Sequence, residues 1–372
     1  MAVDLAETTV TFNVREPEQF IAELKTRVAA FFEERGISPK ANARMVVKTV
    51  VLLLALVVPY LLILSNRFHP LAMLGLAVFM GVAFAGIGFA VSHDALHGAY
   101  SSSPKVNALI GLTFDALGAN GYLWRIMHNV VHHTYTNVPG VDSDLEATWF
   151  LRLSPGAQHR WVHRFQHWYA LAPYSLATLN WVFLKDYKFF FARRIGPYEQ
   201  KRHPLPQWLL LFGGKLFYYA WAIVIPLLVL DVSWWQFAIG FLAMHFTTGI
   251  ILSVVFQLAH VVEETAHLAP DDTGRMRHAW MVHEVLTTAN FSMKNKLLGW
   301  YVGGLNFQIE HHLFPKICSV HYPAISRIVR EVAEKYGIPY HAHPTLFGAI
   351  RSHWATLRRL GRGEGAEAFA AA

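Results

Sequence analysis

The sequence predicts an all-α integral membrane protein, in which four transmembrane helices form two hairpins and a cytoplasmic helical cap holds a di-metal site. Composition is the first indication, because 54% of the residues are hydrophobic and only 15% are charged, whereas soluble domains carry about 25% charged residues. Long apolar runs are the second indication, and short histidine clusters beside them are the third. Together these features predict a metal centre at the surface of a membrane.

Four apolar runs approach the length of about 20 residues that a helix needs to cross a bilayer. They cover roughly residues 46–64, 71–91, 216–230 and 234–258. Short links at 66–70 and 231–233 join them into two hairpins. We therefore expect a membrane domain over residues 46–345, after an N-terminal segment at 1–45 and before a partly disordered tail at 346–372.

Charge asymmetry predicts the orientation of these hairpins. The two short links contain a single basic residue, Arg67, whereas the N-terminal segment and the middle segment at 94–214 are rich in lysine and arginine. The positive-inside rule then places both termini and every histidine cluster in the cytoplasm. If the protein is bacterial, the membrane is expected to be the inner or plasma membrane. The net charge of +7 fits cytoplasmic loops and anionic membrane lipid, so we expect no nucleic-acid partner. Helices along the membrane surface are expected at 106–117 and 171–183.

The histidine clusters have the spacing of metal ligands. Two histidines four residues apart share one face of a helix, with Cβ atoms about 5–6 Å apart. Imidazole suits zinc, copper, iron and nickel, and the single cysteine excludes a thiolate cluster. One ion does not need so many imidazoles, so two metals are expected. The clusters comprise His93 and His97; His128, His132 and His133; and His311 and His312, with Gln308 one turn earlier.

Other residues are candidates by position. His260 ends the fourth apolar run much as His93 ends the second, so it is either a further ligand or a cap of the helix C-terminus. Metal-bound histidines usually donate their other ring nitrogen to a carboxylate or carbonyl. Acids beside the clusters can play that part: Asp94, Asp144 and Glu310. Asp142 is equally well a plain loop acid.

Several histidines are expected not to bind metal. His159, His163 and His167 repeat every four residues, but Arg160 and Arg164 lie between them, and nearby cations disfavour a divalent ion. We interpret this stretch as an amphipathic helix that faces the membrane surface or a partner. The remaining histidines are expected to be ordinary surface or core residues, and His283 is the hardest of them to exclude.

Three motifs resemble those of the membrane fatty-acid desaturase superfamily, over roughly residues 45–345. They are His-Asp-Ala-Leu-His at 93–97, His-Asn-Val-Val-His-His at 128–133 and Gln-Ile-Glu-His-His-Leu-Phe-Pro at 308–315. Gln308, where many relatives have histidine, is similar to the subgroup of front-end and linoleoyl-CoA type desaturases. Phe256 stands where some relatives have an asparagine four residues before the ligand matching His260, which puts a water-mediated metal contact in question.

The resemblance implies a non-heme centre of two iron ions. Its ligands would be His93, His97, His128, His132, His133, His260, His311 and His312, with Gln308 at a ninth position. The implied reaction uses dioxygen to insert a double bond into an acyl chain, carried as acyl-CoA or in a lipid. Electrons would come from a separate donor such as a ferredoxin, cytochrome b5 or a reductase, because no His-Pro-Gly-Gly heme motif is present. The basic surface around Arg160 and Arg164 would suit an acidic donor.

Two other classes of function remain open at this point. A related di-iron hydroxylase or ketolase would use nearly the same ligands. A histidine-rich metal transporter should place polar groups inside several spans, and His245 with Thr247 and Thr248 are the main polar interruptions. That is thin support for a transport pathway.

Overall fold

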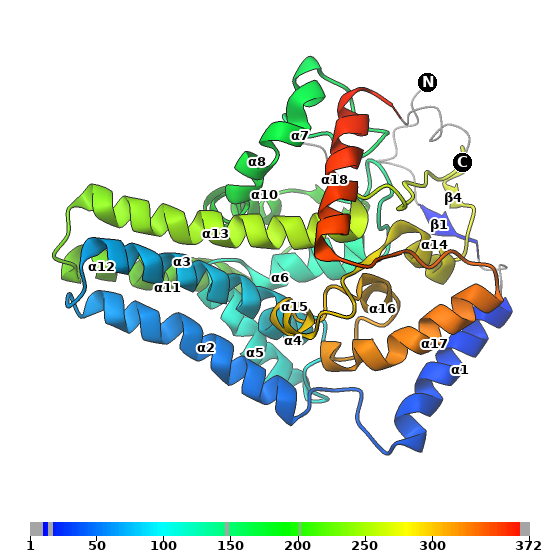
Figure 1. Cartoon of the computed structure of the whole chain (residues 1–372), viewed down its shortest axis with the longest axis horizontal. Helices are drawn as coiled ribbons and strands as arrows, with labels where there is room; N and C mark the ends of the chain where they lie inside the picture. The colour runs from blue at the N-terminus through cyan, green and yellow to red at the C-terminus, as the bar shows by residue number, and fades with distance from the viewer. Residues whose placement is uncertain (1–9, 14–17, 146–148, 201, 365–372) are drawn as a thin grey trace.

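The computed structural model describes residues 10–13, 18–145, 149–200 and 202–364. Within these ranges the chain is mostly helical, and four helices are long and apolar enough to cross a membrane. Figure 1 shows them extending together to one side, while the N-terminal and C-terminal helices gather at the other. Their bounds are Ala43–Leu64, Pro70–Leu96, Leu205–Val229 and Trp234–His260.

The first two long helices lie side by side and lead to the first histidine cluster. Helix α2 (Ala43–Leu64) begins after Asn42, whose side chain accepts hydrogen bonds from the backbone of the first turn. Helix α3 (Pro70–Gly86) begins with a proline, whose fixed φ suits the first helical position. It continues through the π-helical segment η1 (Ile87–Ser92) into α4 (His93–Leu96), so one continuous rod ends at the histidines.

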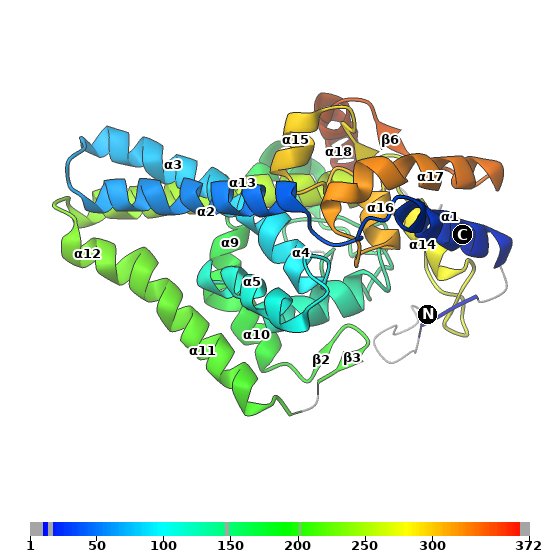
Figure 2. The same ribbon diagram turned by 90° about the horizontal axis from the view of Figure 1, so that it is seen from below.

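The third long helix consists of α11 (Leu205–Tyr219), η5 (Ala220–Val224) and α12 (Ile225–Val229). It begins at Leu205 and not near residue 216, because Pro204 and Pro206 occupy its N-cap and first turn, where proline is tolerated. Lys215, whose charge interrupts the apolar run, is buried inside the protein. Figure 2 shows α11 diverging from the other long helices.

The fourth long helix, α13 (Trp234–His260), packs along α3. Gly81 makes this close approach possible, because a Cβ at that position would lie 2.5 Å from the Met244 carbonyl oxygen. α2, α3 and α13 run side by side in Figures 1 and 2.

The middle segment is a series of mostly short helices. The surface helix expected at 106–117 is α5 (Pro104–Ala116), whereas the one expected at 171–183 is divided among α8, α9 and η4. The remaining bounds are α6 (Gly121–Trp124), η2 (Arg125–His132), η3 (Trp161–Phe165), α7 (Gln166–Tyr169), α8 (Leu171–Ser175), α9 (Ala177–Asn180), η4 (Trp181–Lys185) and α10 (Asp186–Phe190).

Both ends of the chain help to build the cap around the histidines. Helix α1 (Glu18–Glu34) packs on α17 through a core that includes Phe20, Leu24 and Val329. The segment expected as a tail begins with a packed helix, α18, and residues 365–372 lie outside the described ranges. The helices after α13 are α14 (Trp280–Thr287), α15 (Lys296–Tyr301), α16 (Gln308–Leu313), η6 (Ser319–His321), α17 (Tyr322–Lys335) and α18 (Leu346–Gly361).

Among the described residues, three pairs of two-residue strands join loops of the cap. β1 (Thr11–Phe12) pairs in parallel with β4 (Arg275–Met276), and β5 (Asn290–Phe291) pairs in parallel with β6 (Ala342–His343). β2 (Arg194–Ile195) and β3 (Tyr198–Glu199) form an antiparallel pair.

Candidate metal centre

Two of the histidine clusters lie at π-helical segments. His93 directly follows η1, and η2 contains His128 and His132. The wide turn of η2 is closed by the His133 amide, which donates to the His128 carbonyl at 2.9 Å. π-Helical turns are rare and occur frequently at functional sites, which agrees with their positions here.

The structure brings the eight expected ligand histidines into one buried cluster. They come from four separate parts of the chain, and none is more than 7% exposed. Within each of three overlapping groups, the candidate ligand atoms lie within 4.8 Å of one another. The groups are His93, His97, His128 and His311; His132, His260 and His312; and His133, His311 and His312.

All eight of these imidazoles have at least one buried ring nitrogen without a hydrogen-bond partner. An unpaired buried polar group costs about 1–3 kcal/mol, so a concentration of such groups in one place needs an explanation. Bound metal ions would satisfy one nitrogen of each imidazole, and this fits a metal centre. The atoms are Nδ1 of His93, Nε2 of His97, His128, His132, His311 and His312, and both ring nitrogens of His133 and His260.

Three carboxylates are hydrogen-bonded to Nδ1 of three of these histidines, whose Nε2 atoms have no partner. A carboxylate accepts a hydrogen bond from Nδ1–H, which leaves Nε2 with a free lone pair for a metal. Asp144 does this as expected, and Asp142, which the sequence left undecided, does it as well. The pairs are His128 Nδ1 with Asp144 Oδ2 at 3.1 Å, His132 Nδ1 with Asp142 Oδ2 at 2.9 Å, and His312 Nδ1 with Glu284 Oε2 at 2.7 Å.

Glu284 is the residue that sequence reasoning missed. It is fully buried on α14 and also accepts a hydrogen bond from the Thr136 hydroxyl at 2.8 Å. Burial raises the pKa of its carboxyl well above the ordinary range, and Asp142 adds to this, while Thr136 opposes it. A cation bound to His312 would offset that penalty. The available signal was the one acid in a mostly apolar helix.

The other two expected acids support the site differently. Asp94 lies 3.8 Å from His93 Nδ1, and its carboxylate accepts a hydrogen bond from the Ser319 hydroxyl at 2.8 Å. It therefore fastens the loop after α16 to the first cluster. The Glu310 carboxylate accepts from Asn290 and Tyr340, at 2.9 and 2.8 Å.

The electrostatics of the cluster favour neutral imidazoles, the form that binds metals. Burial lowers the pKa of His128 to about 3. Burial and neighbouring histidines together lower the pKa of His97, His133, His311 and His312 well below the ordinary value. His132 differs, because Asp142 and Asp144 outweigh burial and raise its pKa.

Two of the histidines expected not to bind metal are bonded to backbone carbonyls. His163 Nε2 lies 3.1 Å from the Trp149 carbonyl, and His283 Nε2 lies 2.7 Å from the Thr136 carbonyl. Across the described ranges, the metal-compatible groups include neither of them, nor His159 or His167. The expected amphipathic helix is two short helices, η3 and α7, packed on α18.

An apolar cavity of about 270 Å³ adjoins the cluster. Gln308 is buried and lines it together with His93, His128 and His311. Its walls fit tightly around the imidazoles. Trp124 stacks on His128 with ring centroids 4.3 Å apart. The Phe256 ring lies against His132 and His260, with centroids at 5.2 and 4.9 Å.

The cavity follows α3 away from the histidines. Its lining on that helix runs from His93 back to Phe84, which is nine residues or about 13 Å of helix. Exposed Asn180 and half-buried Lys185 also line it. The arrangement therefore combines a candidate metal centre with an elongated apolar space that suits a hydrocarbon chain.

Comparison with known proteins identifies the family. The fatty acid desaturase family model matches residues 68–344. The chain belongs to the fatty acid desaturase family. An sn-1 linoleoyl-lipid 6-desaturase of Arthrospira platensis is 38% identical over 363 residues, which is 96% of each chain. A protein of the same name from Synechocystis sp. is 36% identical, over 91% of this chain and 94% of the relative.

A third relative is an acyl-lipid (8-3)-desaturase of Physcomitrium patens, 33% identical over 95% of this chain and 74% of its own length. These relatives place this desaturase in the front-end subgroup. It is an oxidoreductase that acts on fatty acyl chains. The motif-based resemblance is thus confirmed.

Proposed function

We propose that this desaturase inserts a double bond at the 6-position of linoleoyl chains carried in membrane lipid, at a di-iron centre held by the buried histidines. The substrate and position follow the names of the two relatives with 38% and 36% identity. The observation that carries the metal centre is the set of unpartnered imidazole nitrogens at the end of an apolar cavity.

The histidine groups divide naturally between two irons. His93, His97, His128 and His311 would hold one ion, with the Gln308 amide beside them. His132, His260 and His312 would hold the other, and His133 lies near His311 and His312. When bound, the irons supply the activation of dioxygen. The protein fixes the ligand tautomers through Asp142, Asp144 and Glu284 and keeps bulk water from the acyl chain.

The overall reaction balances with an external reductant. Two hydrogens leave adjacent carbons of the chain, which become a double bond. One dioxygen accepts them with two electrons and two further protons from solution, and two waters form. Because the apolar cavity runs along α3 and α13, the hydrocarbon chain stays out of water while its reacting carbons lie beside the histidines.

Fatty-acid profiling tests this function. The chain is expressed in a host with defined lipids that lacks 6-desaturation, and lipid-bound products are analysed by mass spectrometry with double-bond location. We expect a new 6-double bond with the wild type and with His159→Ala, whose exposed histidine lies outside the metal groups. His132→Ala should abolish the product. Activity in His132→Ala would contradict the metal centre, and a hydroxylated product would indicate a hydroxylase.

The proposed membrane arrangement is two hairpins, with both termini and the histidines in the cytoplasm. The links at 65–69 and 230–233 lie at the end of the long helices away from the cap (Figure 1), and Arg67 is the one basic residue within them. The only cysteine, Cys318, is buried, so single engineered cysteines can be labelled selectively. A membrane-impermeant maleimide should label Arg67→Cys in intact cells, but not Arg358→Cys; the reverse pattern would invert the topology.

An external electron donor is proposed to dock on the outer face of α18. Exposed Arg164, Arg358 and Arg362 surround a shallow pocket there, with Trp168 and Trp354. On the inner face of the same helix, His353 Nδ1 lies 2.7 Å from the carbonyl of Val261, the residue after His260. The basic patch is therefore one helix thickness from the second metal group, and its charge suits an acidic ferredoxin or cytochrome b5.

Charge reversal tests the docking patch. Arg164→Glu with Arg358→Glu should raise the apparent Michaelis constant for reduced ferredoxin roughly tenfold, because like charges slow encounter. The constant for the acyl substrate should stay the same. Arg277→Glu, an exposed site next to β4, is the matched control. An unchanged Michaelis constant for ferredoxin in the Arg164→Glu, Arg358→Glu variant would show that the donor docks elsewhere.

A further inference from the structure

His245 is a buried histidine in the middle of α13 that the metal centre does not use. Its Nδ1 lies 2.9 Å from the Thr178 hydroxyl, and its Nε2 lies 2.5 Å from the Tyr218 hydroxyl. Both ring nitrogens therefore have partners, in contrast to those of His260 on the same helix. A fully bonded histidine of this kind fixes neighbouring side chains in place.

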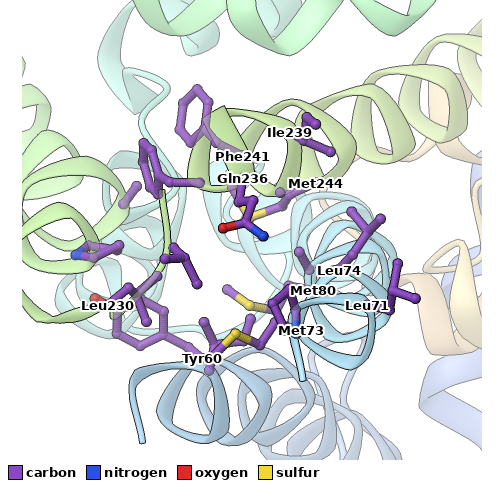
Figure 3. Close-up of a pocket in the computed structure, with 18 of the residues that line it drawn as sticks. Tyr60, Leu71, Met73, Leu74, Met80, Leu230, Gln236, Ile239, Phe241 and Met244 are labelled. Atoms are coloured by element: carbon purple, nitrogen blue, oxygen red, sulfur yellow. The ribbon is translucent and has the colours of Figure 1, made fainter. Parts of the chain in front are cut away.

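His245 contacts residues that line two different cavities. One is the apolar cavity beside the metal groups, here called the acyl cavity, whose lining includes Phe84, Leu117, Thr178 and Val182. The other, here called the interhelical groove, lies among α2, α3, η5, α12 and α13 and has a volume of about 340 Å³. Figure 3 shows its lining, in which Met73, Met80, Met244 and Gln236 approach one another.

A single layer of side chains separates the two cavities on α3 and α13. On α3, Met80 lines the groove, and Phe84, one turn later, lines the acyl cavity. On α13, Phe241 lines the groove and its ring centroid lies 4.6 Å from that of His245. The His245 ring is 6.2 Å from that of Phe84. The imidazole thus contacts the walls of both spaces.

Tyr218 completes this layer from α11. It is fully buried, and Ala222, one turn later, lines the groove. Gly118 lies directly against its ring, because a Cβ there would come within 2.7 Å of the ring carbons. The tyrosine therefore has no room to swing away, and its hydroxyl is held by His245. We call Phe84, Tyr218 and His245 the dividing layer.

We propose that the dividing layer closes the acyl cavity and sets how far the methyl end of the substrate chain can extend beyond the metal centre. This inference rests on the proposed function. Hydrogen bonds in apolar surroundings are strong and rigid. The bonds of His245 to Thr178 and Tyr218 therefore hold the dividing layer in place against a longer chain. The interhelical groove, beyond the dividing layer, is the space that a longer chain would enter if this layer were opened.

Variants at Phe84 test this closure. Phe84→Ala should open the dividing layer toward the interhelical groove. The milder Phe84→Leu is used if Phe84→Ala does not accumulate in membranes. The product ratio of acyl chains two carbons longer than the preferred one should rise roughly tenfold, because one methylene in an apolar pocket changes specificity by about that factor. An unchanged ratio in a variant that accumulates normally and stays active would overturn the proposal.

Filling the groove provides the matched control. A Cβ on Gly240, which lines the groove, would meet only Ala77 Cβ, at 4.0 Å, so a larger side chain fits there. Gly240→Leu alone should leave the wild-type chain-length profile unchanged. Combined with Phe84→Ala, it should remove the extension to longer chains. Failure of the double variant to reverse the shift would mean that the groove is not the space entered.

A readout without catalysis separates this inference from the proposed function. A long-chain fatty acid with a diazirine at its methyl end is supplied to expressing cells, and cross-linked peptides are mapped after illumination. In the wild type the label should attach near Leu117 and Val182; in Phe84→Ala it should move to Met80 and Met244. Wild-type labelling at Met80 or Met244 would overturn the closure even if desaturation occurs. Labelling at Leu117 without any desaturated product would refute the function alone.

Discussion

At the residue scale, hydrogen-bonding partners separate histidines that hold the fold from histidines suited to a metal. His245 and His260 are both buried on α13, yet the first has both nitrogens bonded and the second has neither. Burial alone therefore says little, because a buried imidazole is stable wherever its nitrogens are satisfied. His260 lies within 4.8 Å of two other imidazole ligand atoms, and a cation is the partner that would satisfy all three.

The carboxylate partners make a prediction at this scale. Glu284→Gln replaces the carboxyl partner of His312 Nδ1 with an amide, which can donate as well as accept, so the ligand tautomer is no longer fixed. Loss of such a partner typically lowers metal affinity or activity 10- to 100-fold. We expect a loss of this size in product formation and in iron retained during chelator dialysis.

The matched control for this change is Glu331→Gln. Glu331 is exposed and pairs with Arg27 on the surface, where ion pairs contribute about 0–1 kcal/mol. It should keep wild-type iron and activity. Wild-type iron retention in Glu284→Gln as well would show that Glu284 does not support the centre.

The sequence indicated the candidate ligand histidines more clearly than the carboxylates that accept hydrogen bonds from them. Spacing within one helix is local, so the pairing of His93 with His97 and of His128 with His132 was recognisable from the order of residues alone. Glu284 was missed because it lies in a segment with no ligand histidine, and only folding brings it to His312. Asp142 was undecided for a related reason, because proximity along the chain does not show which way a loop carboxylate points.

At the element scale, the long apolar helices position the site by where they end. The continuous rod from α3 to α4 carries His93 at its end, and α13 ends at His260. Apolar length predicted these helices well. The third long helix begins at Leu205, before the span expected at 216–230, and Lys215 just ahead of that span is buried against Asp186.

That buried ion pair makes the prediction at this scale. Lys215 Nζ lies 2.7 Å from Asp186 Oδ2 and joins α11 to α10, with side chains 3% and 0% exposed. Removing one partner leaves an uncompensated charge in the interior, which costs about 3–5 kcal/mol. Lys215→Met should therefore strongly lower the thermal unfolding temperature of the detergent-solubilised protein.

The double variant Lys215→Met with Asp186→Leu provides the control, because replacing both partners removes the stranded charge. It should recover much of the lost stability. A single variant as stable as the wild type would mean that the pair does not hold α11 against α10.

At the whole-molecule scale, the cap depends on contacts between distant parts of the chain. α1 packs on α17, and α18 packs on η3 and α7. The sequence indicated polar N-terminal and C-terminal segments, but it did not show that they form packed helices of the cap. The sequence of an amphipathic helix shows which face is apolar. It does not show which segment covers that face, because the partner lies far away in sequence.

Buried histidines outside the metal groups predict acid sensitivity of the whole molecule. Burial lowers the pKa of His283 and His353 to about 4 from an ordinary 6.5. Between these values the unfolded chain binds more protons than the folded one, so stability is lost as pH falls below 6.5. Each group should remove about 2 kcal/mol by roughly pH 5.

Unfolding temperatures of the solubilised protein at about pH 7.5 and pH 5 measure this effect. We expect a clear decrease at the lower pH. Replacing His283 by glutamine, which keeps a donor for the Thr136 carbonyl without titrating, should reduce the decrease. An unfolding temperature that does not change with pH would contradict the neutral buried state of these histidines.

The metal content of the purified protein tests the di-iron centre most directly. It is determined by elemental mass spectrometry together with the protein concentration. Eight buried histidines in overlapping groups predict two iron ions per chain in the wild type, and about one in His132→Ala, which lacks a member of the second group. A wild type that holds a single ion, or that binds zinc in place of iron after expression with iron supplied, would contradict the di-iron centre.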